Sequence, residues 1–251
     1  MALIEYYPEQ KKVFLSHLFH TIKAESHLSA DAKIIETLHQ YENVVEAVGV
    51  DNPWKPPYCF QCDLSCGGYE VCQKPHILWF WEHYKKTKQK KKPAKIFTPY
   101  TQRCVESYLL TELEEPFQMS HALGANSAPL LARAAYLKRR FQADWYEVFP
   151  PLSVWRIGRH LHMKKSDLRS YKKSALGESC RRQILASLQQ HDVVFLYKDD
   201  VNTMIQSVHA FDAFICAYTL FLQHTGQTES RPQGFPNEED WIEFPKEKLD
   251  I

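Results

Sequence analysis

The fold class of this chain is predicted from one segment, residues 44–72, with the sequence VVEAVGVDNPWKPPYCFQCDLSCGGYEVC. It begins with an apolar run, residues 44–50, that only Glu46 interrupts. Such a run is typical of a strand buried on both faces inside a mixed α/β sheet. The run ends at Asp51, and Asn52-Pro53 predicts a turn immediately after it. Because sites in open α/β sheets gather at the carboxyl ends of strands, Asp51 is a candidate site residue.

The rest of the chain extends this α/β pattern. Two β-rich runs, residues 2–7 and 12–22, are separated by Pro8-Glu9-Gln10-Lys11 and predict an antiparallel hairpin. A second short strand is predicted at residues 145–149 and an edge strand at 241–244. Helices are expected at residues 30–41, 75–83, 103–113, 130–141, 154–160, 177–190 and 202–224. We therefore expect one α/β domain over residues 1–251, with a cysteine- and lysine-rich insertion at 53–97.

Composition narrows the class of protein. The chain has 251 residues, of which 44% are hydrophobic, and a formal net charge of +1, so a disordered or fibrous protein is excluded. We find neither an N-terminal signal pattern nor an apolar run of about 18 residues, and we expect a cytoplasmic protein that does not cross a membrane. In a reducing compartment, the seven cysteines favour metal binding over disulfides.

Four of these cysteines are candidate metal ligands. Cys59, Cys62, Cys66 and Cys72 form the pattern C-x2-C-x3-C-x5-C, and Gly67-Gly68 gives the segment the freedom to wrap around an ion. Four thiolates suit a structural Zn²⁺ site. An iron–sulfur cluster takes the same ligands, and free thiols in a loop are the alternative without metal.

Three acidic residues are candidates for a second site. Asp212 lies in the apolar final helix, where a carboxylate needs a partner. That partner is either His209, one turn earlier, or a Mg²⁺ ion shared with Asp51. Glu147 lies in the short strand WYEVF and is either an edge residue that faces water or a third site residue. The pattern alone leaves these alternatives open.

Basic residues suggest a nucleic-acid partner. Residues 85–95, KKTKQKKKPAK, contain seven lysines that could neutralise phosphates, although such a run is also typical of a solvated segment. Arg103 and Glu106 share a helix face, which predicts a surface ion pair. The lysines that we single out for nucleic-acid binding are Lys88, Lys90, Lys91 and Lys92.

Five motifs occur in the order of a known family: VGVDNPWKPP, FTPYTQRCVESYLL, WYEVFPPLSVWRIG, LRSYKK and HAFDAFICAYTLFL. From about residue 44 to 244 the chain resembles the family called domain of unknown function 429, whose members are regarded as predicted nucleases with an RNase H-like fold. The resemblance implies that Asp51, Glu147 and Asp212 are catalytic and hold Mg²⁺ or Mn²⁺. It also aligns Arg103 and Lys172 with polar positions of the family, as expected for nucleic-acid binding.

One feature departs from the family pattern. The family would place a strand with an aspartate first, whereas this sequence starts Met-Ala-Leu-Ile-Glu. Either the chain is a truncated form, or Glu5 substitutes, or the first carboxylate is absent. We therefore predict a divalent-metal-dependent nuclease. The alternative is a non-catalytic, zinc-stabilised module that binds nucleic acid or protein.

Overall fold

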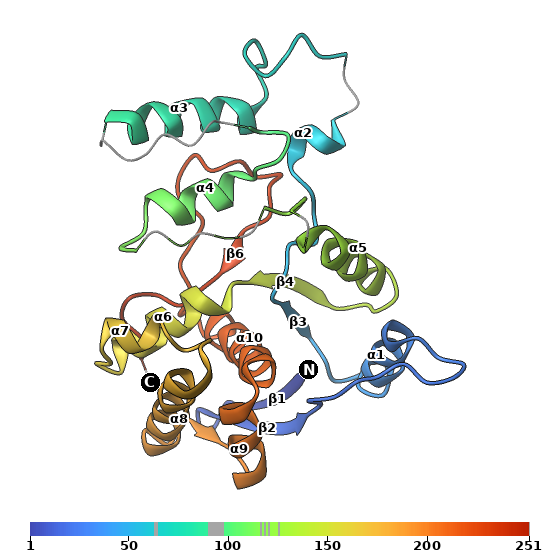
Figure 1. The fold of residues 1–251 in the computed structure, drawn as a ribbon, viewed down its shortest axis with the longest axis vertical. Helices are drawn as coiled ribbons and strands as arrows, with labels where there is room; N and C mark the ends of the chain where they lie inside the picture. The colour runs from blue at the N-terminus through green and yellow to red at the C-terminus, as the bar shows by residue number, and fades with distance from the viewer. Residues whose placement is uncertain are drawn as a thin grey trace. The chain divides into compact units, whose positions relative to one another are not determined.

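The computed structural model describes residues 1–250 except 63–64, 90–97, 116, 118, 120 and 125. The chain forms two compact units, which are described separately below (Figure 1). Unit 1 comprises Met1–Asp51, Leu137–Glu229 and Glu243–Ile251, and unit 2 comprises Asn52–Tyr136 and Ser230–Ile242. The predicted insertion, residues 53–97, lies inside unit 2.

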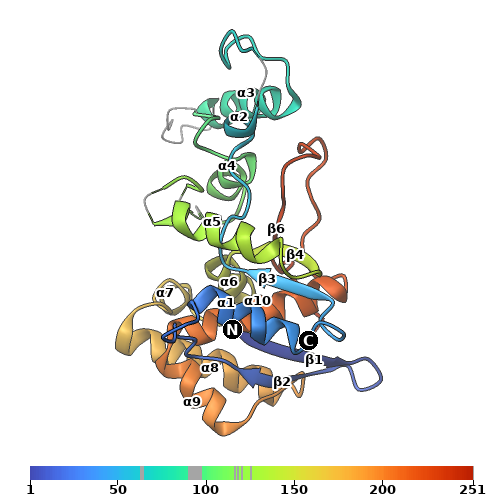
Figure 2. The same cartoon turned by 90° about the vertical axis from the view of Figure 1, so that its right-hand side faces the viewer.

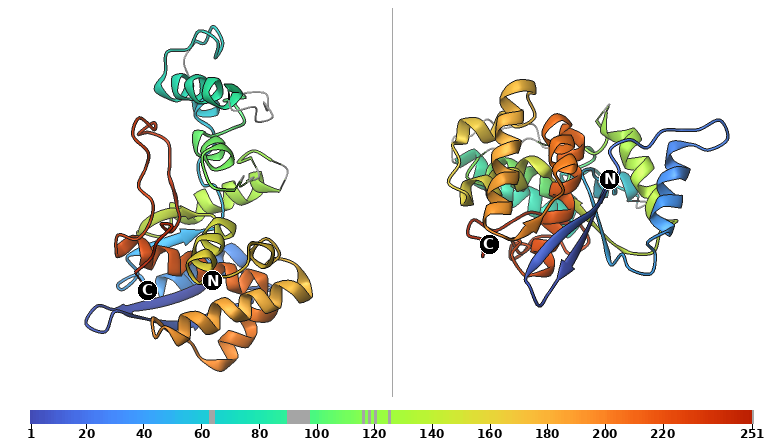
Figure 3. Two further views of the ribbon diagram at one scale, coloured as in Figure 1. Left: turned by 90° about the vertical axis from the view of Figure 1, so that its left-hand side faces the viewer. Right: turned by 90° about the horizontal axis from the view of Figure 1, so that it is seen from below.

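The fold is mixed α/β, as predicted, with two three-stranded sheets flanked by helices. The first sheet has the order β1-β2-β5. The strands β1 (Ala2–Tyr7) and β2 (Lys12–Leu18) pair antiparallel, which confirms the predicted hairpin. The short strand β5 (Val194–Phe195) pairs parallel with β2. Helix α10 (Val208–His224) packs against both strands of this hairpin (Figures 2 and 3).

The second sheet has the order β3-β4-β6 and brings two candidate residues to one edge. Its strands β3 (Ala47–Val50) and β4 (Asp144–Val148) are parallel, and Val50 pairs with Glu147. Asp51 directly follows Val50. Asp51 and Glu147 therefore lie near the carboxyl-terminal ends of two neighbouring parallel strands. The edge strand β6 is short (Ile242–Glu243).

Helices of unit 1 cover these sheets. The core between α1 and the second sheet contains Leu38, Phe141 and Trp145, and Ser29 caps α1 by accepting a hydrogen bond from the Ala32 amide at 3.1 Å. The helices are α1 (Ala30–His39), α6 (Pro150–His160), α7 (Lys165–Leu168), α8 (Ser174–Gln190), α9 (Lys198–Gln206) and α10 (Val208–His224).

The final helix is divided, so the prediction of one helix over residues 202–224 is wrong. Ser207 has an extended backbone conformation with φ −106° and ψ 111°, which ends α9. Its hydroxyl then accepts a hydrogen bond from the Ala210 amide at 3.3 Å and caps α10. A serine inside an apolar run thus gives a sharp corner that hydrophobic periodicity does not reveal.

Unit 2 is helical. Its helices are α2 (Tyr58–Gln61), α3 (Pro75–Gln89), α4 (Cys104–Thr111) and the larger part of α5 (Ser127–Lys138). Phe235, from the second segment of this unit, packs edge-on against Trp79 of α3 and against Trp241, with ring centroids 5.3 and 5.2 Å away. Aromatic contacts of this kind join the two segments of the unit.

Within the described residues, no single helix has the length and apolar character needed to cross a membrane. The pair α9 and α10 passes the same test together, but it is bent by 115° at its break.

Candidate functional site

Three carboxylates of unit 1 lie near one another, and one lysine is close to two of them. Asp51 at the end of β3 lies within electrostatic range of Asp212 of α10, Glu147 of β4 and Lys172. These are the three acidic residues singled out in the sequence. Glu147 is only 1% exposed, so the alternative that it is an edge residue facing water is wrong.

The close packing of α10 against β3 aligns Asp212 with this edge. Asp212, Cys216 and Leu220 are spaced four residues apart and share one face of the helix. Cys216 and Leu220 pack in the core of the second sheet. A Cβ on Gly49 of β3 would lie 3.2 Å from both the Cys216 carbonyl oxygen and the Leu220 side chain. Glycine at position 49 therefore permits α10 to approach β3 closely. Asp212 lies on the same face of α10, one turn N-terminal to Cys216.

Asp212 has two hydrogen-bonding partners from the LRSYKK motif. The Tyr171 hydroxyl donates to Oδ1 at 3.1 Å, and Lys172 Nζ lies 3.0 Å from Oδ2. The sequence pattern indicated His209 as an alternative partner of Asp212. Among the groups that shift the pKa of Asp212, His209 has the smallest effect. Asp212 is therefore held mainly by Tyr171 and Lys172. Sequence reasoning missed Tyr171, whose only signal was its place next to Lys172.

The segment that carries these two residues is fixed by α8. Buried Arg181 donates from Nε to the Ile205 carbonyl at 2.9 Å and from its guanidinium to the Tyr171 carbonyl. A Cβ on Gly177 would lie only 2.4 Å from the Tyr171 carbonyl oxygen, so glycine is required for the segment to pass this close to the helix. These contacts with α8 hold Tyr171 and Lys172 in position beside Asp212.

The electrostatics of the cluster are unbalanced. Burial, together with the charges of Asp212 and Glu147, raises the pKa of Asp51 to about 7, although Lys172 opposes the shift. Asp51 is nevertheless an exposed residue, and the water that reaches it weakens this shift. Burial also raises the pKa of Asp212 against the opposing effect of Lys172. Lys172 therefore does not fully compensate the charges of Asp51 and Asp212.

The donor atoms fit a hard divalent cation in chemical type. Carboxylate oxygens are the ligands that Mg²⁺ and Mn²⁺ prefer. Unsatisfied negative charge at the edge of the sheet is what such an ion would neutralise. Among the described residues, however, no group of three or more His, Cys, Asp or Glu side chains is already arranged to hold a metal. Both oxygens of Asp212 are engaged by Tyr171 and Lys172, so a cation would compete with the lysine for this carboxylate.

Glu5 lies elsewhere. It is exposed on β1 and accepts a hydrogen bond from the Tyr7 hydroxyl at 2.9 Å. Its neighbour Tyr6 packs against Phe221 and His224 at the C-terminal end of α10, whereas Asp212 is in the first half of that helix. Among the described groups, Glu5 is not one of those that shift the pKa of Asp51. The structure therefore gives no support to Glu5 as a substitute for the first carboxylate.

The model of the family described as "Protein of unknown function (DUF429)" matches residues 100–237. The chain belongs to this family. The predicted resemblance is thereby confirmed, and the match includes Glu147, Lys172 and Asp212 while Asp51 and the clustered cysteines lie before it. Neither a curated protein nor a solved structure matches.

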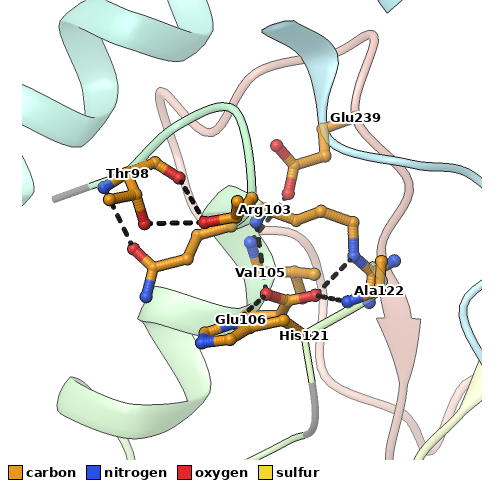
Figure 4. Close-up of polar contacts among 9 residues, drawn as sticks. Thr98, Arg103, Val105, Glu106, His121, Ala122 and Glu239 are labelled. Atoms are coloured by element: carbon orange, nitrogen blue, oxygen red, sulfur yellow. Dashed lines mark hydrogen bonds and ion pairs between the residues drawn. The ribbon is translucent and has the colours of Figure 1, made fainter. Parts of the chain in front are cut away.

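Unit 2 of this DUF429 protein contains a second buried polar cluster, which Figure 4 shows. Arg103 Nε donates to Glu106 Oε1 at 2.9 Å, and His121 Nδ1 lies 3.2 Å from Glu106 Oε2. The Ala122 amide also donates to Glu106, at 3.3 Å. Nearby, the carboxylate of Glu239 accepts a hydrogen bond from the Val105 amide at 2.8 Å and caps α4.

The prediction of a surface ion pair between Arg103 and Glu106 is wrong, because the two residues are only 2% and 6% exposed. The helical spacing correctly predicted that Arg103 and Glu106 form a pair. It could not predict that the pair is buried, because the burial comes from residues 121–122 and Glu239, which are distant in sequence. Burial alone would raise the pKa of Glu106, but the bonds from His121 and Arg103 lower it overall. Arg103 has almost no surface to offer a phosphate, so its position indicates a structural role.

The remaining predicted residues belong to the cysteine and lysine segments of the DUF429 chain. All seven cysteines lie in the described residues and are free thiols. Burial first, and then the nearby thiols Cys72, Cys62 and Cys66, raise the pKa of Cys59 to about 11, so these four cysteines share one neighbourhood. Lys90, Lys91 and Lys92 and the side chain of Lys88 lie outside the described residues.

Proposed function

We propose that this DUF429 protein is a divalent-metal-dependent nuclease of RNase H-like architecture that hydrolyses phosphodiester bonds in nucleic acid. The observation that carries the proposal is the convergence of Asp51, Glu147 and Asp212 from a strand, its parallel neighbour and a C-terminal helix. The family resemblance implies a catalytic role for the same three residues. The clustered free thiols support a cytoplasmic location.

Charge is the main physical support for a cation at this position. Lys172 is the cation that acts on both Asp51 and Asp212, yet the pKa of each carboxyl group stays raised. A site built only for stability would pair each buried carboxylate or replace it by a neutral residue. Burial raises both pKa values more than Lys172 lowers them, and raised pKa values of this kind are typical of functional sites.

The residues around the carboxylates have distinct roles in this proposal. A bound divalent ion would supply an activated water molecule and stabilise the oxygen that leaves the phosphate. Asp51, Glu147 and Asp212 would hold the ion. Tyr171 orients Asp212 through its hydroxyl group, and Lys172, whose side chain is 46% exposed, can move from Asp212 to a phosphate oxygen. The lysines at 88 and 90–92 would add affinity for the nucleic-acid backbone.

The test is a cleavage assay with Mn²⁺ or Mg²⁺ on single- and double-stranded DNA and RNA. We expect the wild-type chain to cleave at least one substrate, and Asp212→Asn to lose at least about 100-fold in rate because a metal ligand is removed. Asp144→Asn is the matched control, since Asp144 is exposed at the opposite end of β4 from the site. Cleavage that survives Asp212→Asn would contradict the assignment of the site.

A second candidate function follows from two observations. Glu5 lies outside the carboxylate cluster, and Lys172 already pairs with Asp212. Both observations suit a non-catalytic, zinc-stabilised module that binds nucleic acid or protein. The same assay separates the two functions: salt-dependent binding of nucleic acid without cleavage in either metal would favour the module.

A further inference from the structure

His76, in the first turn of α3, is buried without satisfying its polar atoms. It is 2% exposed, and within the described part of the chain neither ring nitrogen has a hydrogen-bond partner. Oε2 of Glu238 lies 3.9 Å from Nε2, which is too far for a hydrogen bond. Buried polar groups without partners are rare, and each calls for a physical reason such as a ligand.

The surroundings of His76 place a thiol nearby. The ring of Tyr58 stacks on His76 with centroids 3.9 Å apart, and Cys59 is the next residue. The Sγ atom of Cys104 donates to the His76 carbonyl oxygen at 3.7 Å. Cys59 also lies within electrostatic range of Cys104. Cys59 and His76 are therefore in the same part of unit 2, held there by Tyr58 and Cys104.

The spacing of the sequence around His76 is that of two ligand pairs. Cys59-x2-Cys62 is one pair, and Cys72-x3-His76 is the other. Pairs separated by two to four residues are typical of structural zinc sites, in which three thiolates and one imidazole are a common set. Cys62-x3-Cys66 has a similar spacing, but Cys66 is exposed, whereas Cys59, Cys62 and Cys72 are partly buried.

We propose that Cys59, Cys62, Cys72 and His76 form a structural Zn²⁺ site in unit 2 and that Cys66 is not a ligand. This inference does not depend on the nuclease proposal. A zinc ion would satisfy one orphaned nitrogen of His76 and would join the short helix α2 to the start of α3. Because the described residues contain no finished site, binding has to draw the thiols together and release their protons.

Metal analysis of the purified full chain tests the ligand set. We expect about one equivalent of zinc per chain, retained in Cys66→Ser and lost in His76→Ala and Cys59→Ser. Cys66→Ser is the matched control because it removes a thiol from the same segment. Loss of zinc in Cys66→Ser, retention in His76→Ala, or a wild-type chain that binds no zinc would each overturn the proposal.

A second measurement is independent of how well the variants fold. X-ray absorption at the zinc edge of the wild-type chain reports the ligand atoms directly. We expect three sulfur neighbours at about 2.3 Å and one nitrogen at about 2.0 Å, which are typical zinc–thiolate and zinc–imidazole distances. Four sulfur neighbours, or iron with inorganic sulfide in place of zinc, would overturn the assignment of His76.

Discussion

The two carboxylate clusters of this protein, one in each unit, differ in how their charge is compensated. In unit 2, Glu106 accepts bonds from Arg103, His121 and the Ala122 amide, and its pKa is lowered despite burial. In unit 1, Asp51 and Asp212 share Lys172, and their pKa values are raised. The residue types are similar, but the shifts have opposite signs.

This difference distinguishes stabilising interactions from a site. A carboxylate with several donors contributes to stability in its charged form, since every bond is lost on unfolding. Carboxylates that face one another with a single cation are held close at a cost in free energy. A divalent cation bound there would offset that cost, so the unit 1 cluster is the candidate for function and the unit 2 cluster for structure.

The largest expected effect concerns the balanced cluster. We expect Glu106→Gln to destabilise the protein by about 3–5 kcal/mol, because the buried Arg103 would lose its ion pair with Glu106. Urea unfolding of the metal-free chain measures this loss. The matched control is the double variant Arg103→Met, Glu106→Met, which removes both charges and should cost less than the single change. A loss below about 1 kcal/mol for Glu106→Gln would show that this cluster is not the structural one.

A smaller effect of opposite sign is expected in unit 1. The raised pKa of Asp51 means that the folded chain holds this proton more tightly than the unfolded chain. The stabilisation is complete below the unfolded pKa of about 3.9 and is lost as the pH rises through the folded pKa of about 7. We therefore expect Asp51→Asn to stabilise the metal-free protein at pH 8 by about 0.5–1 kcal/mol, a modest value because solvent reaches Asp51.

Unfolding at pH 4 and pH 8 provides the check on this prediction. At pH 4 Asp51 is largely protonated, so wild type and Asp51→Asn should have nearly the same stability. The raised pKa of Asp212 acts in the same direction, so Asp212→Asn is a useful second variant, although it also removes the bonds to Tyr171 and Lys172. An Asp51→Asn variant less stable than wild type at pH 8 would mean that the cluster is balanced after all.

The smallest effect concerns the lysine tract. Changing Lys88, Lys90, Lys91 and Lys92 to Gln should flatten the salt dependence of nucleic-acid binding, because each phosphate contact contributes roughly 0.9 to the slope. Binding to a DNA duplex over a range of salt concentrations measures this slope. A control variant changes exposed lysines elsewhere, Lys11, Lys23, Lys198 and Lys248. If the salt dependence of binding has the same slope for the two variants, the lysine tract does not contact the phosphates and only makes the chain more soluble.

Local patterns predicted much of the fold and singled out three carboxylates that lie near one another in unit 1. The hairpin, the strand before Asp51 and the short strand with Glu147 follow from alternating or continuous apolar runs, and Asp212 stands out because it interrupts an apolar helix. The corner at Ser207 was missed because a single cap outweighed periodicity. Tyr171 and His76 were missed for another reason: their roles depend on contacts with residues distant in sequence, which spacing alone does not reveal.

The most direct test of the central claim is calorimetric titration of Mn²⁺ into the full chain at pH 7.5. We predict that wild type and the control Asp144→Asn bind Mn²⁺ alike, and that Asp51→Asn and Asp212→Asn each lose this binding. Zinc already held by the cysteine segment would not change this comparison, since all four proteins share it. Equal Mn²⁺ binding by all four proteins, or by none, would contradict the claim that Asp51, Glu147 and Asp212 form a divalent-cation site.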